Sequence, residues 1–348
     1  MHILHALFSS RIAGSERYCA DLANRQAAAG HDVSVAGSPG SPLRELLSRR
    51  VRYHPLGWCL RGPRLRRLVR TLRPDISHGH LSAACKALAA LPPGFHTVAT
   101  LHVGYKRHQH GRLGGVICVN HAQSGRLAGY EGVVRVIPNW LPAPTPAGAG
   151  PGLRASLGID PGTFLVGAVG RLHPSKGMDV LIAAFQECAP TDAALVILGE
   201  GPDRPRLEKL SAGDERIHLP GFRPDVQACL PDLDLFVCPS REESFGLAIL
   251  EAMHARLPVI ATATDGPAEF LRDHPVVLVP PGSTRALGPA LTSAHDRFRQ
   301  GGRGRQDYEL GAFDAAARVE SILAFYHQVA AAQRRRPVDL VREVPAST

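Results

Sequence analysis

Two glutamates stand on either side of the expected start of a helix in the second half of the chain. Glu243 precedes Ser244 and Gly246, which are residue types that favour helix starts, and Glu251 lies in the apolar run that follows. Backbone N–H groups at a helix start have no partner within the helix, so they can bind an anion. The pattern fits a diphosphate held between two groups that bind hydroxyls. Two glutamates on a solvated helix would give the same pattern.

A basic loop upstream offers a second place for phosphate. Residues 163–170 are typical of a buried strand, and they lead into a loop with Arg171 and Lys176 before an amphipathic helix begins near Asp179. Arg171 presents a planar fork to phosphate oxygens, and Lys176 is a mobile point charge. The loop lacks the Gly-Lys-Ser/Thr ending of a Walker sequence. Two cations between a strand and a helix indicate an anion site of another kind.

Three further segments complete a pattern that is similar to a known family. They are Gly199-Glu200-Gly201-Pro202, Leu219-Pro220-Gly221-Phe222, and residues 258–262 with Gly266 and Glu269 after them. With the two stretches above, they make almost all of the segment from about 160 to 285 resemble a retaining glycosyltransferase of family 4, also called glycosyl transferases group 1. Weaker similarities come before it, at residues 13–17, 100–102 and 137–139.

The resemblance implies a task for each matching residue of the donor site. Arg171 and Lys176 neutralise the diphosphate as charge builds on the leaving group, Glu251 holds the ribose hydroxyls, and Glu243 holds hydroxyls of the transferred sugar. Fixed cations and a helix N-terminus at the departing diphosphate would be electrostatic catalysis. The donor is expected to be a nucleoside diphosphate sugar, UDP- or GDP-linked, which is a co-substrate. No other cofactor and no metal is required.

The resemblance also implies site residues in the first half of the chain. His102, at the end of a strand, matches a histidine that contacts the sugar, although a lone histidine at a strand end is usually structural. Gly14 matches a glycine that lets the backbone approach the phosphates. The catalytic set is then Arg171, Lys176, Glu243 and His102. The substrate-binding set is Gly14, Gly199, Glu200, Ser244, Phe245, Gly246, Leu247 and Glu251.

Two positions depart from the family pattern. Arg256 stands where the family generally has glycine, and Ala13 stands where the first of two glycines is common. Neither change removes a charge that the chemistry needs. The donor site is therefore expected to be intact, whereas the first loop departs from the family pattern at Ala13.

Length and periodicity indicate two domains. With 348 residues the chain exceeds the size at which a single core usually stops growing. Strand and helix patterns alternate in both halves, which favours parallel, doubly wound sheets. As the resemblance implies, we expect a GT-B fold with two Rossmann-like α/β domains facing across a cleft. Their expected bounds are 1–158 and 159–312, with a Pro- and Gly-rich linker at 142–152, and 313–348 form a helix that crosses back and a polar tail.

The charge of the chain is concentrated in its first half. Residues 1–150 hold 19 Lys and Arg against 6 Asp and Glu, and the remainder holds 21 against 25. Much of the excess lies at 61–73, where arginines alternate with an apolar face. Such a helix can bind an acidic membrane or can dock on its own sheet with a solvated arginine face. Because GT-B enzymes hold the acceptor in the first domain, we expect an anionic or membrane-borne acceptor.

Other sites and compartments are not indicated. Asp232-Leu233-Asp234 has the spacing of a metal site in other glycosyltransferases, but apolar neighbours make it the start of a buried strand. The seven cysteines are scattered and are expected to be reduced core thiols. No run reaches the roughly 18 apolar residues of a membrane span, and the first residues lack a basic signal region. We expect a cytoplasmic protein with peripheral contact at the inner face of the membrane through residues 61–73.

These observations predict a hexosyltransferase-type glycosyltransferase for a glycan or glycolipid, in polysaccharide or lipopolysaccharide assembly. A nucleotide-sugar 2-epimerase of GT-B fold would share the donor cleft, but it needs no basic acceptor domain. A nucleic-acid-binding Rossmann-like protein would explain the basic half, yet aromatic residues make up only 5% of the chain and no nucleic-acid partner is expected. A dinucleotide dehydrogenase would need a third glycine after Gly201.

Overall fold

The computed structural model describes residues 1–141, 143, 152–301 and 303–335. The chain forms two compact units. Unit 1 comprises residues 1–118, 123–137 and the C-terminal segment from 316, and unit 2 comprises residues 119–122 and 138–315. Most of the linker expected at 142–152, and the tail beyond residue 335, lie outside the described residues.

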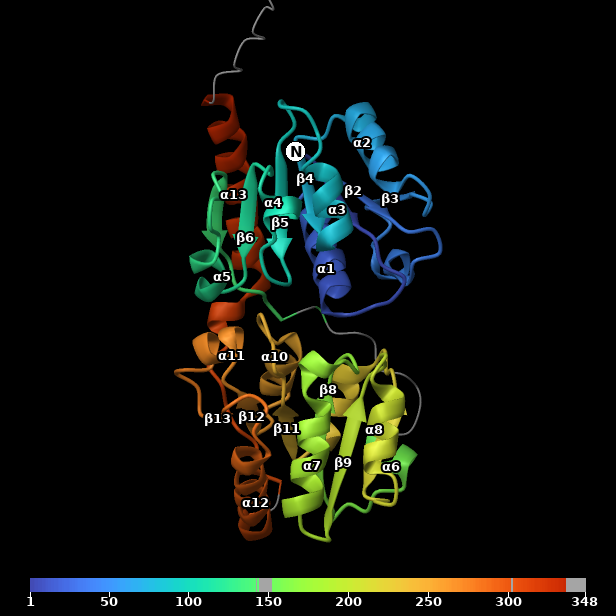
Figure 1. The fold of residues 1–348 in the computed structure, drawn as a ribbon, viewed down its shortest axis with the longest axis vertical. Coiled ribbons are helices and arrows are strands. Elements are labelled where there is room, and N and C mark those ends of the chain that lie inside the picture. Colours follow the sequence, from blue (N-terminus) through green and yellow to red (C-terminus); the bar gives the residue numbers. More distant parts are fainter. Residues whose placement is uncertain (142, 144–151, 302, 336–348) are drawn as a thin grey trace, which may run out of the picture. The chain divides into compact units, whose positions relative to one another are not determined.

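Unit 1 is built on a parallel sheet that has seven strands in the described part of the chain (Figure 1). In spatial order they are β3 (Arg52–Pro55), β2 (Asp32–Gly37), β1 (His2–Leu7), β4 (Ile76–His80), β5 (Thr97–Leu101), β6 (Gly115–Cys118) and β7 (Val133–Val136). β1 pairs with β2 on one side and β4 on the other. β4 and β5 are buried along their whole length, as in a sheet that is covered on both faces.

Helices cover this sheet. They are α1 (Gly14–Ala28), the 3-10 turn Pro42–Leu46, α2 (Arg61–Leu72), α3 (Leu81–Leu88), α4 (Arg107–His110) and α13 (Ala315–Arg335). α5 (His121–Gly125) contains a boundary between the two units. All but the first residue of α13 belongs to unit 1, in which Tyr326 is fully buried.

The arginine-rich helix α2 packs its apolar face within unit 1. Leu65 and Val69 are fully buried in a cluster with Leu4 and Leu88. The side chains that α2 leaves exposed are mostly charged, among them Arg64, Arg67 and Arg70. The apolar face of α2 is therefore part of the core, and an external partner meets arginines.

Unit 2 is built on a second parallel sheet, with six strands among the described residues. In spatial order they are β10 (Ile217–Gly221), β9 (Ala193–Leu198), β8 (Phe164–Val169), β11 (Leu235–Cys238), β12 (Val259–Thr262) and β13 (Val277–Val279). Side chains of β8 alternate between two cores, with Phe164 and Val166 on one face and Leu165 on the other. This explains why β8 reads as a continuous apolar run.

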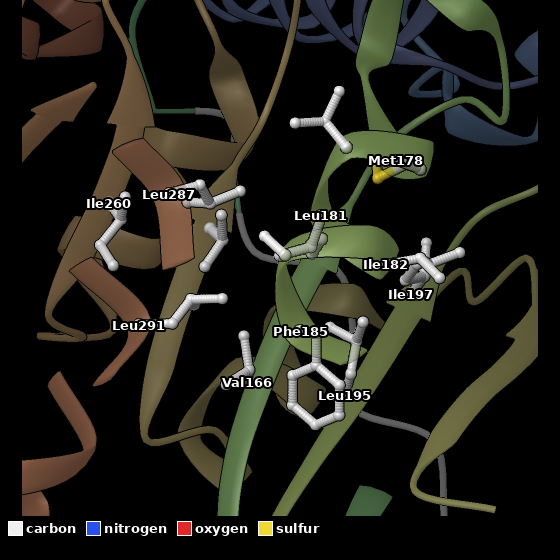
Figure 2. Close-up of a cluster of buried hydrophobic side chains, with 14 of the residues drawn as sticks. Val166, Met178, Leu181, Ile182, Phe185, Leu195, Ile197, Ile260, Leu287 and Leu291 are labelled. Carbon is white, nitrogen blue, oxygen red and sulfur yellow. The ribbon is translucent and has the colours of Figure 1, made fainter. Parts of the chain in front are cut away.

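Helices and 3-10 turns surround the second sheet. They are α6 (Leu153–Leu157), the turn Pro174–Lys176, α7 (Met178–Cys188), α8 (Arg204–Ser211), α9 (Val226–Cys229), the turn Leu230–Asp232, α10 (Leu247–His254), α11 (Asp265–Phe270), α12 (Thr284–Gly301) and the turn Gly311–Phe313. Figure 2 shows Leu181 and Phe185 of α7 with Val166 of β8 and Leu291 of α12 in one buried cluster.

The prediction of two parallel-sheet α/β domains is confirmed. Several boundaries differ in detail. The last helix, expected from Phe313, starts at Ala315 after a 3-10 turn and continues to Arg335. Cys59 is exposed and is not a core thiol. In the described part of the chain, no helix is both long and apolar enough to cross a bilayer.

The departure at Arg256 has a structural correlate. α10 ends at His254, and Arg256 has a φ of 60°, in the left-handed region that favours glycine. Its guanidinium forms an ion pair of 2.7 Å with Asp307. This conformation costs an ordinary residue about 1 kcal/mol, and it explains why glycine suits the position.

Candidate active site

The candidate site of unit 2 lies where the loops after β8, β9 and β11 meet. β8 pairs with β9 on one side and with β11 on the other, so residues 170–177, 199–203 and 239–246 all leave the carboxyl edge of the sheet. The strand order reverses at β8, since β9 and β10 lie on one side and β11 to β13 on the other. Open α/β sheets bind ligands at such a switch point.

Lys176 and Glu243 form an ion pair in this place. Lys176 Nζ donates a hydrogen bond of 2.5 Å to Glu243 Oε2, and the two side chains are 27% and 16% exposed. Burial alone would lower the pKa of Lys176, but the Glu243 carboxylate and the hydrogen bond outweigh burial, so the pKa is raised. Lys176 is therefore a fixed cation at neutral pH. The sequence suggests separate tasks for these residues, whereas the structure joins them.

Arg171 stands near the start of the same loop, whereas Lys176 stands near its end. It follows β8 by two residues and its side chain is exposed. Its guanidinium makes no hydrogen bond or ion pair with any residue that the structure describes. The planar fork is thus available to an external anion.

A second ion pair fixes the two loops to each other. Arg241 Nη1 and Nη2 donate to the two carboxylate oxygens of Asp179 at 2.7 and 2.9 Å. The backbone N–H groups of Arg241 and Glu242 donate to the Ser175 carbonyl at 2.8 and 3.1 Å. Burial would raise the pKa of Asp179, but its bonds to Arg241 and Arg206 lower it to about 2. Sequence reasoning gave Arg241 and Asp179 no role.

Two glycines allow the loops to come this close. Gly177 has a φ of 64°, and a Cβ on it would lie 2.0 Å from the Pro239 carbonyl oxygen. Gly199 has a φ of 153°, and a Cβ on it would lie 1.9 Å from the Gly170 carbonyl oxygen. Real Cβ atoms do not approach carbonyl oxygens this closely, so both positions need glycine.

The helix start predicted between the two glutamates is present. α10 begins at Leu247, and Gly246 caps it with a φ of 96°. The N–H groups of Gly246, Leu247 and Ala248 donate to no residue in the described chain, whereas Phe245 N–H lies 3.5 Å from Glu243 Oε1. Open amides therefore begin at Gly246, whereas the amide of Phe245, a member of the predicted substrate-binding set, is bonded within the loop.

The remaining predicted residues of unit 2 have other partners. Glu251 lies inside α10, is 7% exposed, and accepts a hydrogen bond of 3.0 Å from Gln227. Glu200 is exposed and accepts a bond of 3.0 Å from Arg204. Ser244 is half-buried in the loop before α10. Glu243, Ser244 and Glu251 thus belong to one loop and the helix it starts.

Gly14 and His102 belong to unit 1. Gly14 is the first residue of α1 and is exposed. The carboxylate of Glu16 caps this helix start by accepting the Ala13 N–H at 3.0 Å. His102 directly follows β5 and is half-buried.

A chain of hydrogen-bonded histidines leads to His102. Gln26 Nε2 donates to the Tyr326 hydroxyl at 3.3 Å, so Gln26 Oε1 accepts from His5 Nε2 at 2.7 Å. His5 Nδ1 then accepts from His80 Nε2 at 3.1 Å, and His80 Nδ1 accepts from His102 Nε2 at 3.0 Å. Each ring can place only one proton when neutral. The chain therefore fixes His102 as the tautomer with a proton on Nε2 and a lone pair on Nδ1.

Burial keeps these histidines neutral. It lowers the pKa of His102 to about 4, and it lowers that of His5 to about 4 although the bond to Gln26 acts in the opposite direction. The pKa values of His78 and His80 are lowered well below their usual range, first by burial and then by the neighbouring rings. At neutral pH the His102 ring therefore carries no charge, and its Nδ1 can accept a hydrogen bond.

Three of these four rings form the one group of three potential metal ligands among the described residues. The ligand atoms of His5, His78 and His80 lie within 4.8 Å of one another. Both ring nitrogens of each are already hydrogen-bonded, those of His78 to Tyr326 at 2.7 Å and to Thr100 at 2.9 Å. Protein partners thus account for all six nitrogens. Sequence reasoning missed this cluster, and its signal was the His-Gly-His end of β4 beside His5 of β1.

The Asp-x-Asp sequence has a structural role. Asp232 ends a 3-10 turn, and Asp234 stands just before β11 with its side chain 1% exposed. Asp234 pairs with Arg154 and accepts the Leu165 N–H at 2.8 Å. The strand therefore begins at Leu235, slightly later than expected.

Comparison with known families agrees with this geometry. Residues 12–142 match the family model Glycosyltransferase Family 4, and residues 163–296 match Glycosyl transferases group 1. The two matches fall in the two halves of the chain and include most of the motifs quoted above.

The chain belongs to the family 4 glycosyltransferases.

The curated relatives that this family 4 chain resembles are also named glycosyltransferases. A D-inositol 3-phosphate glycosyltransferase of Segniliparus rotundus is 31% identical over 204 residues, which are 54% of this chain and 45% of the relative. A lipopolysaccharide core biosynthesis glycosyltransferase, LpsE of Rhizobium meliloti, is 24% identical over 78% of this chain and 82% of its own. The chain spans 38 to 46% of the length of several relatives at 31 to 35% identity.

Solved structures establish the fold of the family 4 chain. Alr3699/HepE of Anabaena, crystallised in complex with UDP and glucose, has a TM-score of 0.78 at 21% identity and covers 94% of this chain and 100% of its own. A likeness at this identity shows the architecture, which is GT-B.

Proposed function

We propose that the chain transfers a sugar from a nucleoside diphosphate to a hydroxyl of an anionic glycan or glycolipid, with retention of the anomeric configuration. One observation carries the proposal. Exposed Arg171, the cation of Lys176 and the open N–H groups at the start of α10 belong to loops at one carboxyl sheet edge, beside Glu243. Such a set can stabilise a leaving diphosphate next to a group that binds hydroxyls.

Side-chain cations and backbone amides would both stabilise the negative charge on the leaving diphosphate. Arg171 offers a fork for two phosphate oxygens, and Lys176 offers a point charge that must first leave Glu243. The amides of Gly246, Leu247 and Ala248 add partial positive charge at the helix start. Because protein groups supply this charge, we propose that the reaction needs no metal ion.

The sugar and the nucleoside would be held by groups near this edge. Glu243, once Lys176 turns to the diphosphate, accepts hydroxyls of the transferred sugar, and Glu251 binds the ribose. Gly199, Glu200 and the loop 244–247 complete the donor site. Gly14 and His102 are proposed to bind substrate from unit 1, His102 through the lone pair that its tautomer presents on Nδ1.

Two relatives support the substrate classes. The complex of HepE with UDP and glucose supports a UDP-linked donor, with GDP as the alternative. The name of LpsE supports an acceptor in lipopolysaccharide core biosynthesis. The exposed arginines of α2 support peripheral contact with acidic lipid at the inner face of the membrane, by charge alone, because Leu65 and Val69 are buried.

Titration calorimetry with UDP and GDP tests the donor site. We expect Arg171→Ala and Lys176→Ala each to weaken binding about tenfold, since a charged hydrogen bond contributes about 1.5 kcal/mol or more. Arg285→Ala, which removes an exposed arginine from α12, is the matched control and should bind like the parent. Equal binding by all three variants would contradict the proposal.

Product analysis tests the reaction. Incubation with UDP-glucose or GDP-mannose and a lipopolysaccharide core acceptor should give a glycoside with the anomeric configuration of the donor by NMR, in EDTA as in buffer. Free nucleotide with a 2-epimerised sugar would instead identify an epimerase. Activity that EDTA abolishes and Mn²⁺ restores would contradict metal independence.

A further inference from the structure

Unit 1 contains a hollow between α2, α3 and α4, and none of its lining residues belongs to the histidine chain. Its volume is about 490 Å³, within the range of ligand sites. Its lining residues are basic or small, with glycine and alanine between the basic ones and no carboxylate. We call it the basic hollow, and its basic members are Arg61, Arg66, Lys86, Arg107, His108 and Arg112.

Four cations of the basic hollow have no polar side-chain partner in the part of the chain that the structure describes. Arg66, Lys86, Arg107 and Arg112 form no ion pair or hydrogen bond through their side chains with any described residue. Other arginines of this protein have carboxylate partners, as Arg241 has Asp179. Several unpaired cations around one space repel each other, and an anion in that space would remove the repulsion.

Arg61 gives a second, independent sign of a missing anion. Its Nε and Nη2 atoms are buried and have no hydrogen-bond partner. The guanidinium lies over the rings of Phe8 and Trp58, with its carbon 4.8 and 4.3 Å from the ring centroids. The rings attract the charge but cannot accept its in-plane N–H groups. Buried guanidinium nitrogens without acceptors are costly, so Arg61 would gain hydrogen bonds if its side chain turned from the rings to an anion in the basic hollow.

The composition of the basic hollow indicates the chemistry of its ligand. Four of its cations are arginines, whose forks match phosphate oxygens in pairs. Five cations together call for more than one negative charge. The alanines and Gly62 leave room beside the charges for a compact, uncharged body such as a sugar ring.

We propose that the basic hollow binds the phosphate groups of a phosphorylated saccharide, which is the acceptor of the transfer. The identity of the ligand as acceptor rests on the proposed function, whereas the anion site rests on the residues of unit 1. A lipid-linked saccharide and a free saccharide phosphate present the same groups to the arginines.

Binding of inorganic pyrophosphate tests the site. The parent for this test carries Arg171→Ala and Lys176→Ala, which remove the phosphate cations of unit 2. The hollow variant adds Arg66→Gln, Lys86→Gln and Arg112→Gln. The matched control adds Arg64→Gln, Arg67→Gln and Arg70→Gln, which remove the same charge from the exposed face of α2. Circular dichroism and thermal unfolding establish that all three proteins are folded.

We expect the hollow variant to bind pyrophosphate at least about tenfold more weakly than the parent, and the control to stay within about twofold, since distant exposed charges are screened. Equal loss in both variants, or loss in neither, would overturn the proposal. The hollow variant in the native background should still bind UDP. If the native chain binds no nucleotide, the proposed function fails, but the pyrophosphate comparison still decides the anion site.

Vesicles distinguish the two sources of the phosphate. Phosphatidylcholine vesicles receive either phosphatidic acid or phosphatidylglycerol at equal charge, so that bulk attraction is the same. Preference of the native chain for phosphatidic acid, lost in the hollow variant, assigns the site to lipid-borne phosphate. Equal sedimentation with both vesicles, together with the pyrophosphate loss, assigns it to a free phosphorylated saccharide.

Discussion

Replacing Glu243 by glutamine should strengthen the binding of free UDP while it weakens the use of the sugar. In the structure Glu243 holds Lys176 at 2.5 Å, so a diphosphate must compete with this carboxylate for the lysine. Glutamine keeps the size of the side chain and removes its charge. Lys176 would then be free to meet the diphosphate, and no carboxylate would repel it.

The size of the gain follows from the exposure of the pair. A hydrogen bond between charged groups contributes about 1.5 to 3 kcal/mol, and an exposed pair contributes about 0 to 1. With 27% and 16% of the two side chains exposed, the pair lies between these cases. We take about 1 kcal/mol, which corresponds to a roughly fivefold lower Kd for UDP.

Calorimetry with UDP and UDP-glucose checks this prediction at pH 7.5 and low salt. Glu243→Gln should bind UDP more tightly, lose the additional affinity that the glucose moiety provides, and turn over more slowly. Glu242→Gln is the matched control, because Glu242 is the neighbouring carboxylate, is exposed, and has no side-chain bond to Lys176. The reasoning is refuted if Glu243→Gln weakens UDP as Lys176→Ala does, or if Glu242→Gln gives the same gain.

Three further outcomes are expected. Gly177→Ala should weaken UDP binding in calorimetry, because its Cβ would lie 2.0 Å from the Pro239 carbonyl oxygen. Gly158→Ala is the control, since Gly158 has a similar φ of 68° and open space around it; this variant should show only the cost of backbone strain and bind UDP normally. Arg154→Met should lower the unfolding free energy of unit 2 by about 3 kcal/mol, since the buried Asp234 carboxylate loses its buried partner and, among the described residues, keeps only the more exposed Arg303 as an ion-pair partner. Arg223→Met, at an outer pair, should cost under about 1 kcal/mol. Urea titration followed by the fluorescence of buried Trp140 measures both. In the unfolded chain His5 is protonated below about pH 6.5, whereas in the folded protein its pKa of about 4 keeps it neutral to lower pH. The unfolding free energy is therefore highest above pH 6.5, and about 3 kcal/mol of it is lost as the pH falls to 4. The rate of hydrogen exchange in β1 and β4 should rise over this window, and an unchanged rate would contradict the prediction.

Local signals predicted the elements that carry the site. The apolar run of β8 reveals a strand buried on both faces, and the rhythm after Gly246 reveals α10, because both follow from side-chain periodicity along one segment. The charged residues between them were recognised from their types and from the family motif. The position of Glu243 before the helix and of Glu251 within it needed no tertiary information.

Pairing between distant segments was decided by the tertiary structure. β8 lies between β9 and β11, and this order alone brings Lys176 to Glu243 and Asp179 to Arg241. Periodicity along a strand does not state which strand lies beside it, since many orders bury the same faces. The sequence therefore predicted the ligands of a phosphate but not the ion pairs that hold them.

Unit 1 shows the same difference between what the local sequence predicts and what tertiary packing decides. The sequence alone established its parallel α/β class, its basic charge and the amphipathic pattern of α2. Only the packing of β1 beside β4 joined His5 to His80, 75 positions apart, and only the packing of α2 and α3 gathered unpaired cations around one space. Local sequence determines which faces are apolar and where charge lies. Which charged and polar groups meet depends on long-range contacts that exist only once the chain has folded.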